Sequence, residues 1–228
     1  MCGRFGFDIP RGVLREHFGL GALYDAPPRY NVAPGQDAPV VLLHPEDGSR
    51  VLRSLRWGLV PSWAGDAKGG ARLINARSES AADKPAFRAA FRRRRCLVPA
   101  AGFYEWKRLD RGRQPWWLRL AGGGPLAFAG LWEHWLDPAA PPAAATLYTF
   151  AILTCAANEL TAQVHDRMPV ILAPRDYAAW LDPAASRPDL EALLAPWPAA
   201  DMEAWPVSPR VNNPKNDDPS LLDRVEAA

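Results

Sequence analysis

The sequence predicts an α+β fold built on an irregular, barrel-like sheet of mixed or antiparallel strands, with short peripheral helices. Three observations predict it. Many short apolar runs are bounded by turn residues, helical periodicity is confined to a few short segments, and strands and helices do not alternate as they do in a doubly wound fold. With no internal repeat and no clear linker, we expect residues 1–228 to form one domain.

The first half of the chain is expected to hold four strands and two helices. Pro10 suits a first helical turn, and apolar residues at helical spacing follow it. Two segments are expected to be loops, PPRYNVAPGQ at 27–36 and the Gly-rich, polar stretch at 61–80. The expected elements are a strand at 2–7, a helix at 10–20, strands at 38–44 and 51–60, a helix at 84–94 and a strand at 96–108.

The second half is expected to be mostly strand. An Ala/Pro stretch at 138–145 reads as a surface loop between two of these strands. The expected elements are strands at 115–120, 124–135, 147–156 and 168–174, helices at 174–182 and 189–196, and a last strand at 202–209.

Bulk composition favours a globular protein of the cytoplasm. Hydrophobic residues make up 48% of the chain. No apolar run reaches the roughly 18 residues of a membrane span, and the N-terminus lacks the apolar core of a signal peptide. The three cysteines form no CxxC motif or disulfide framework, and we expect Cys96 and Cys155 to be small buried hydrophobes.

Positive charge is concentrated in the first half of the chain. Residues 1–120 hold 21 Lys and Arg against 11 Asp and Glu, whereas the remainder holds 6 against 14. Most of these cations are arginines, which suit phosphates and stack on bases, and several tryptophans lie among them. The pattern is typical of a nucleic-acid-binding protein, although an ordinary solvated face would have the same charge.

Common cofactor and metal motifs are absent. The chain has no GxGxxG, GxxxxGK[ST], HExxH or GxSxG motif, and its four histidines are scattered. We therefore expect no cofactor and no metal.

Cys2 is the first candidate for a reactive centre. Removal of Met1, which is usual before a small second residue, would leave Cys2 with both a free α-amine and a free thiol. An α-amine has a pKa of about 7.7–8.0, so part of it is neutral at pH 7 and can attack a carbonyl to form an imine. The neighbouring thiol can then close a five-membered thiazolidine, which an internal cysteine cannot do.

Four polar residues in other segments are further candidates. Asn75 stands in LINARSES, Glu105 in GFYEWK, Thr154 in ILTCAAN and His165 in VHDRMPV. Strand alternation sends Glu105 to the face opposite its aromatic neighbours, where desolvation would raise its pKa and suit it to acid–base work. Each also has a purely structural reading: a turn cap for Asn75, an ion pair for Glu105 and a hydrogen-bonded core residue for His165.

Taken in order, these segments resemble one family. The motifs MCGRF, RYNVAPGQ, WGLVPSW, LINARSE, LVPAAGFYEWK, ILTCAAN, VHDRMPVIL and PVSPRVNN are similar to those of the SOS-response-associated peptidase (SRAP) family. The resemblance runs from Cys2 to about Asn213, so the core is expected at about 2–213 with a C-terminal tail after it. It implies covalent capture of abasic sites in single-stranded DNA as part of the DNA damage response.

The resemblance also implies a division of roles among the catalytic residues. Cys2 would form the imine through its amine and close the thiazolidine with its thiol. Glu105 would handle protons at the amine and the sugar, and His165 would assist ring opening of the sugar. Asn75 would orient the sugar, and Thr154 would support the arrangement of Cys2 and Glu105.

DNA-binding residues follow from the same resemblance. Arg4, Arg77 and Arg167 would contact phosphates, which makes binding salt-dependent. Trp106 would pack against a base or sugar. Cys155 departs from the family pattern, because a second polar residue usually stands beside Thr154.

Three other functions remain open at this point. Cys2 could be the nucleophile of a thiol peptidase acting on the chain's own N-terminus, or its imine could cleave the strand by β-elimination as an abasic-site lyase. The chain could also be a plain single-strand-binding module with no role for Cys2. The expected partner is single-stranded DNA with abasic sites, without a membrane, and we expect a monomer that associates with the bacterial nucleoid and replication fork.

Overall fold

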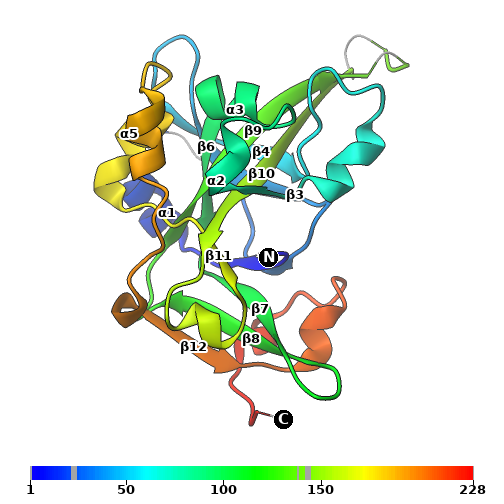
Figure 1. Ribbon diagram of the computed structural model, residues 1–228, viewed down its shortest axis with the longest axis vertical. Helices are drawn as coiled ribbons and strands as arrows, with labels where there is room; N and C mark the ends of the chain where they lie inside the picture. The colour runs from blue at the N-terminus through cyan, green and yellow to red at the C-terminus, as the bar shows by residue number, and fades with distance from the viewer. Residues whose placement is uncertain (1, 22–24, 138, 142–144, 228) are drawn as a thin grey trace.

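The computed structural model of the chain describes residues 2–21, 25–137, 139–141 and 145–227. Its centre is a closed five-stranded barrel in the order β10-β4-β3-β6-β9, in which β9 pairs back onto β10 (Figure 1). The β4–β10 pair is parallel and the other four pairs are antiparallel. The barrel strands are β3 (Asp37–Leu43), β4 (Arg50–Trp57), β6 (Arg95–Ala100), β9 (Leu126–Leu136) and β10 (Thr146–Ala156). The expected barrel-like α+β fold is therefore confirmed.

A second, fully antiparallel sheet lies below the barrel in Figure 1, in the order β12-β8-β7-β1-β2. The strands are β1 (Phe5–Phe7), β2 (Arg29–Val32), β7 (Gly102–Arg108), β8 (Arg113–Leu120) and β12 (Met202–Pro206).

The two sheets join at the corner between β6 and β7. Gly102 starts β7 here because a Cβ atom at this position would lie 2.4 Å from the ring of Trp117. Next to the corner, Phe128 of the barrel packs edge-on against Phe5 and Phe103 of the second sheet. The single strand expected at 96–108 is thus two strands in different sheets, because the chain turns at Ala101.

Short helices cover the outside of the barrel. The first, α1, buries Leu14 and Phe18 and ends at Gly19, whose φ of 63° is the left-handed conformation that favours glycine. Burial of each large apolar side chain contributes about 1.5–3 kcal/mol. The other helices are shorter than expected at 84–94, 174–182 and 189–196. The helices are α1 (Arg11–Phe18), α2 (Ser78–Ala81), α3 (Arg88–Arg93), α4 (Tyr177–Leu181) and α5 (Arg187–Ala192).

Both segments expected to be loops contain regular structure. The stretch at 27–36 supplies β2, which pairs with β1, and the stretch at 61–80 supplies β5 (Asn75–Arg77) and α2. Within the second stretch, a Cβ atom on Gly70 would lie 2.7 Å from the carbonyl oxygen of Gly58, so the two backbones are in contact. Both strands depend on partners far away in the chain, which local composition does not reveal. The Ala/Pro loop at 138–145 lies partly outside the described residues.

The residues expected to form a C-terminal tail are packed onto the second sheet. Leu221 is fully buried beside Tyr104 and Trp117. In the described part of the chain, no helix is long and apolar enough to cross a membrane. Cys96 and Cys155 are buried, as expected.

Candidate active site

The candidate catalytic residues come from segments that are far apart in sequence. Cys2 lies just before β1, and β1 pairs with β7, which carries Glu105. Asn75 lies in β5, which runs parallel to β10 with Asn75 opposite Ile152. Thr154 lies further along β10, and β11 (Arg167–Pro169), which follows His165, pairs with the same end of that strand. Sheet pairing thus assembles the site between the barrel and the second sheet.

Asn75 holds the backbone of Cys2. Its side-chain amide donates a hydrogen bond of 2.7 Å to the Cys2 carbonyl oxygen. Its Oδ1 atom is buried and accepts no hydrogen bond from the described residues. A buried acceptor without a donor is costly in a folded protein. Asn75 therefore fixes the nucleophile with one end and offers the other end to a hydroxyl or amine that enters the site.

The thiol of Cys2 is fully buried, with 0% exposure. Burial raises the pKa of this thiol well above its ordinary value, and the negative charge of Glu105 raises it further. The backbone N–H of Arg4 acts in the opposite direction through a hydrogen bond. The resting sulfur is consequently a neutral thiol, which is a poor nucleophile until a proton acceptor is beside it.

Glu105 is buried in β7, at 2% exposure. Burial raises the pKa of its carboxyl group, and the positive charge of a protonated His165 counteracts this. The sequence-based expectation that alternation would turn Glu105 away from solvent holds. A carboxyl group with a raised pKa next to Cys2 can serve as a proton donor and acceptor.

His165 has a partner for each of its protonation states. Its Nδ1 atom lies 3.0 Å from the backbone N–H of Arg167, which a neutral ring accepts. The same atom lies 2.9 Å from Oδ1 of Asp166, which pairs with a protonated ring. Because both forms are accommodated and the ring interacts electrostatically with Glu105, His165 suits proton transfer in the same site.

The guanidinium group of Arg167 already has partners within the protein. It forms a bidentate pair with Glu79, with distances of 2.5 and 2.9 Å, and it donates to the carbonyl oxygen of Thr154 at 2.5 Å. The hydrogen bonds of Glu79 raise the pKa of Arg167. Thr154 is fully buried beneath this group. The pair ties α2, which carries Glu79, to the β10–β11 corner beside His165.

Arg4 and Trp106 form a second group beside Cys2. The Arg4 guanidinium lies over the Trp106 ring at 5.9 Å from its centroid and donates to Asn31 and to the Val211 carbonyl, each at 2.7 Å. The indole N–H of Trp106 donates to Asn212 at 2.7 Å. The orientation of both side chains therefore depends on the C-terminal segment.

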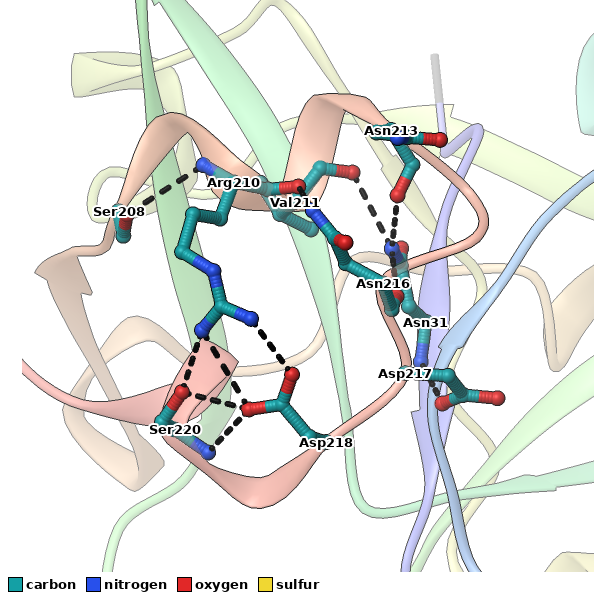
Figure 2. A network of polar contacts seen from close by, with 9 residues as sticks. All are labelled: Asn31, Ser208, Arg210, Val211, Asn213, Asn216, Asp217, Asp218 and Ser220. Carbon is teal, nitrogen blue, oxygen red and sulfur yellow. Dashed lines mark hydrogen bonds and ion pairs between the residues drawn. The ribbon is translucent and has the colours of Figure 1, made fainter.

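Figure 2 shows how that C-terminal segment is held. The side-chain amide of Asn31 donates to the carbonyl oxygens of Val211, Asn213 and Asn216, at 3.2, 3.1 and 2.7 Å. The carboxylate of Asp217 accepts from the backbone N–H groups of β2 and from Arg29. The segment thus forms one wall of the site.

Sequence reasoning did not single out Glu79, Asn31, Asn212 or Asp217. Glu79 and Asn212 stand inside motifs that the family resemblance used, LINARSE and PVSPRVNN, so their place beside chosen residues was the available signal. Asp217 lies beyond those motifs, and no local pattern marks it. Arg77, in contrast, is exposed at the end of β5 and makes no side-chain hydrogen bond to the described residues.

Metal ligands are not gathered anywhere in the described ranges. No group of three or more His, Cys, Asp or Glu side chains there could hold a metal ion. The chemical groups of the site are the Cys2 thiol, a buried carboxyl group, an imidazole and a buried amide.

A barrel joined to a second sheet, with a buried Cys2 beside Asn75 and Glu105, defines the class of this protein. The chain belongs to the SOS response associated peptidase (SRAP) family, whose family model matches residues 1–214.

Two similar proteins are named abasic site processing proteins. The abasic site processing protein YoqW of Bacillus subtilis is 44% identical over 229 residues, which cover 98% of this chain and 99% of that protein. The abasic site processing protein HMCES of Xenopus tropicalis is 31% identical over 223 residues, which cover 86% of this chain and 65% of that protein.

Solved structures share the fold. A protein from Bacteroides thetaiotaomicron superposes with a TM-score of 0.84 at 23% identity, covering 99% of this chain and 100% of that one. A phage-related protein from Bordetella bronchiseptica superposes with a TM-score of 0.69 at 31% identity, covering 90% of this chain and 94% of that one.

Proposed function

We propose that this protein processes abasic sites by forming a covalent thiazolidine crosslink between mature Cys2 and the ring-opened aldehyde of an abasic site in single-stranded DNA. The observation that carries the proposal is the arrangement around Cys2, with Asn75 bonded to its carbonyl oxygen and Glu105 close enough to raise the pKa of its thiol. The names of the curated relatives support abasic-site processing.

The burial of the thiol favours an order in which the amine reacts first. The Cys2 nitrogen attacks the aldehyde carbon, and the resulting carbinolamine loses water to give an imine. The sulfur then adds to the imine carbon while its proton moves to the nitrogen, which closes the five-membered ring. Overall one water is released, and no oxidant or cofactor is needed.

The surrounding groups have matching tasks. Glu105 accepts the proton of the attacking amine and returns protons to the leaving water, since its raised pKa allows both directions. His165, which interacts electrostatically with Glu105, supports ring opening of the sugar. The free Oδ1 of Asn75 accepts a sugar hydroxyl.

Arg4, Arg77 and Trp106 supply the DNA contacts. Arg77 is exposed and unpaired among the described residues, so it can meet a phosphate directly. Arg167 reaches a phosphate only by sharing or leaving its pair with Glu79, and the geometry favours a positioning role for it. A peptidase reaction is less well supported, because a buried thiol with a raised pKa is not primed as a thiolate.

The test uses single-stranded DNA carrying one abasic site. Wild-type protein should give a heat-stable adduct on a denaturing gel, with a mass equal to the protein without Met1 plus the DNA less one water. Cys2→Ala should give none, whereas Cys96→Ala, which removes another fully buried thiol, should react like wild type. An equal adduct from Cys2→Ala would refute the proposal, and strand cleavage without a stable adduct would point to the lyase alternative.

A further inference from the structure

A large open groove lies away from Cys2, between α3 and the segment that leads into α5. Its volume is about 820 Å³. One wall carries Arg88, Arg92, Arg93 and Arg94, and the opposite wall is formed by Pro183, Ala184, Ala185, Ser186 and Arg187. Figure 1 shows α2 and α3 next to each other at the end of the molecule away from the C-terminus, with α5 at the same end.

The arginine run at 92–95 divides into two structural members, Arg94 and Arg95, and two free members, Arg92 and Arg93. Arg95 is buried and donates to the carbonyl oxygens of Phe91, Trp180 and Asp182, so it holds α4 to the barrel. Arg94 pairs with the buried Glu133 at 2.5 Å. These two residues stabilise the fold and are not available to a ligand.

Arg88, Arg92 and Arg93 are exposed and make no ion pair or side-chain hydrogen bond to the described residues. Arg88 and Arg92 stand four residues apart in α3, where like charges are neighbours and destabilise a helix. On the opposite wall, Arg187 is neutralised by Asp83 and Glu191. The groove therefore keeps three uncompensated positive charges on one side and a neutral Pro/Ala surface on the other.

The groove lies at one end of α2, and Arg77 lies at the other end of this helix. Ala82, which lines the groove, directly follows α2, and Arg77 precedes α2 as its N-cap residue. At about 1.5 Å per helical residue, the two positions are about 7–8 Å apart.

We propose that this groove binds the phosphate backbone of the DNA strand that extends from the abasic site beyond Arg77, with Arg88, Arg92 and Arg93 as the phosphate contacts. This inference rests on the proposed function for its ligand. The neutral Pro/Ala wall accommodates sugars and bases without sequence preference, which suits a sensor that must accept any flanking sequence.

The experiment measures binding of intact single-stranded DNA by fluorescence anisotropy, so it does not depend on crosslinking. Short DNA has about two nucleotides on each side of a central position, and long DNA extends either the 5′ or the 3′ side to about eight. The measured quantity is the dissociation constant for short DNA divided by that for each long DNA. Wild type should gain affinity on extension of one side only.

The key variant is Arg88→Ala/Arg92→Ala. At moderate salt, this variant should lose about tenfold of the affinity that wild type gains when the DNA is extended. For long DNA, the slope of log affinity against log salt should fall by about 1.4. Arg88→Lys/Arg92→Lys should keep most of the gain because the charges remain. The matched control Arg15→Ala/Arg53→Ala removes two exposed, unpaired arginines elsewhere and should keep the wild-type ratio.

Folding does not confound the result, because alanine relieves the like-charge pair in α3 and should leave the melting temperature unchanged or slightly higher. The proposal would be overturned if the Arg88→Ala/Arg92→Ala variant kept the wild-type ratio of dissociation constants and the wild-type salt slope. It would also be overturned if wild type gained the same affinity from the 5′ and the 3′ extension. Absence of a Cys2 adduct with the length effect intact would instead overturn only the crosslinking chemistry.

Discussion

Replacing Asn75 by alanine removes both functions that the structure gives this side chain. The amide no longer donates its 2.7 Å hydrogen bond to the Cys2 carbonyl oxygen, and the buried Oδ1 no longer meets an incoming sugar hydroxyl. Each of these hydrogen bonds contributes about 0.5–1.5 kcal/mol. The two together amount to about 1–3 kcal/mol, which corresponds to a rate loss of about 5- to 150-fold.

The assay is a single-turnover crosslinking time course at several concentrations of DNA that carries one abasic site. We expect the loss mainly in the maximal rate, because Asn75 fixes the nucleophile and the reacting sugar and does not contact the phosphates. Gln114→Ala is the matched control, since it removes a 2.8 Å bond from a buried side-chain amide to the Val207 carbonyl oxygen.

The reasoning would be refuted by a maximal rate for Asn75→Ala within about twofold of wild type. It would also be refuted by an equal loss in Gln114→Ala, because the effect would then reflect general loosening of the structure. A thermal melt of each variant separates the two cases.

Three other perturbations test the site and its supports. Glu105→Gln should lower the crosslinking rate about 10²- to 10⁴-fold and remove the increase in rate as pH rises through the raised pKa of Glu105. Because burial raises that pKa, wild type loses stability as the pH rises above the ordinary pKa of a carboxyl group. The Gln variant should therefore melt at a higher temperature than wild type at pH 7 but not at pH 4. Equal melting temperatures at both pH values would contradict the burial argument. Asn31→Ala removes three hydrogen bonds to carbonyl oxygens of the C-terminal segment and should cost about 1–3 kcal/mol in urea unfolding, whereas an unchanged midpoint would mean that the segment is held by other contacts. Gly102→Ala forces a Cβ atom against Trp117 and should destabilise by about 1–3 kcal/mol or more, which a wild-type melting temperature would exclude.

Local sequence was sufficient to predict the strands of the barrel. The apolar runs that became β3, β4, β9 and β10 are bounded by turn residues, and their pattern depends only on neighbours along the chain. It was not sufficient for β2 and β5. Both are short and polar or proline-rich, and each is a strand only because a distant partner supplies its hydrogen bonds.

The residues of the candidate site were also recognisable one by one from their motifs. Their arrangement was not, because the contacts that define it cross between segments. Glu79 engages Arg167, Asn212 engages Trp106 and Asn75 engages the backbone of Cys2. A motif names the residue type at each position, whereas a hydrogen bond needs two positions brought within about 3 Å.

Cys2 and the arginine run at 92–95 show most clearly what the sequence determines and what the tertiary structure decides. Sequence alone determined that Cys2 can present an amine and a thiol on adjacent carbons, because this is a property of its position in the chain. It also determined that Arg92 to Arg95 are four adjacent cations. Only the tertiary structure decided that the Cys2 thiol is buried against Glu105, and that Arg95 and Arg94 serve the core while Arg92 and Arg93 face an open groove. Burial and pairing decide what a charge or a thiol can do, and both depend on contacts that only the folded chain creates.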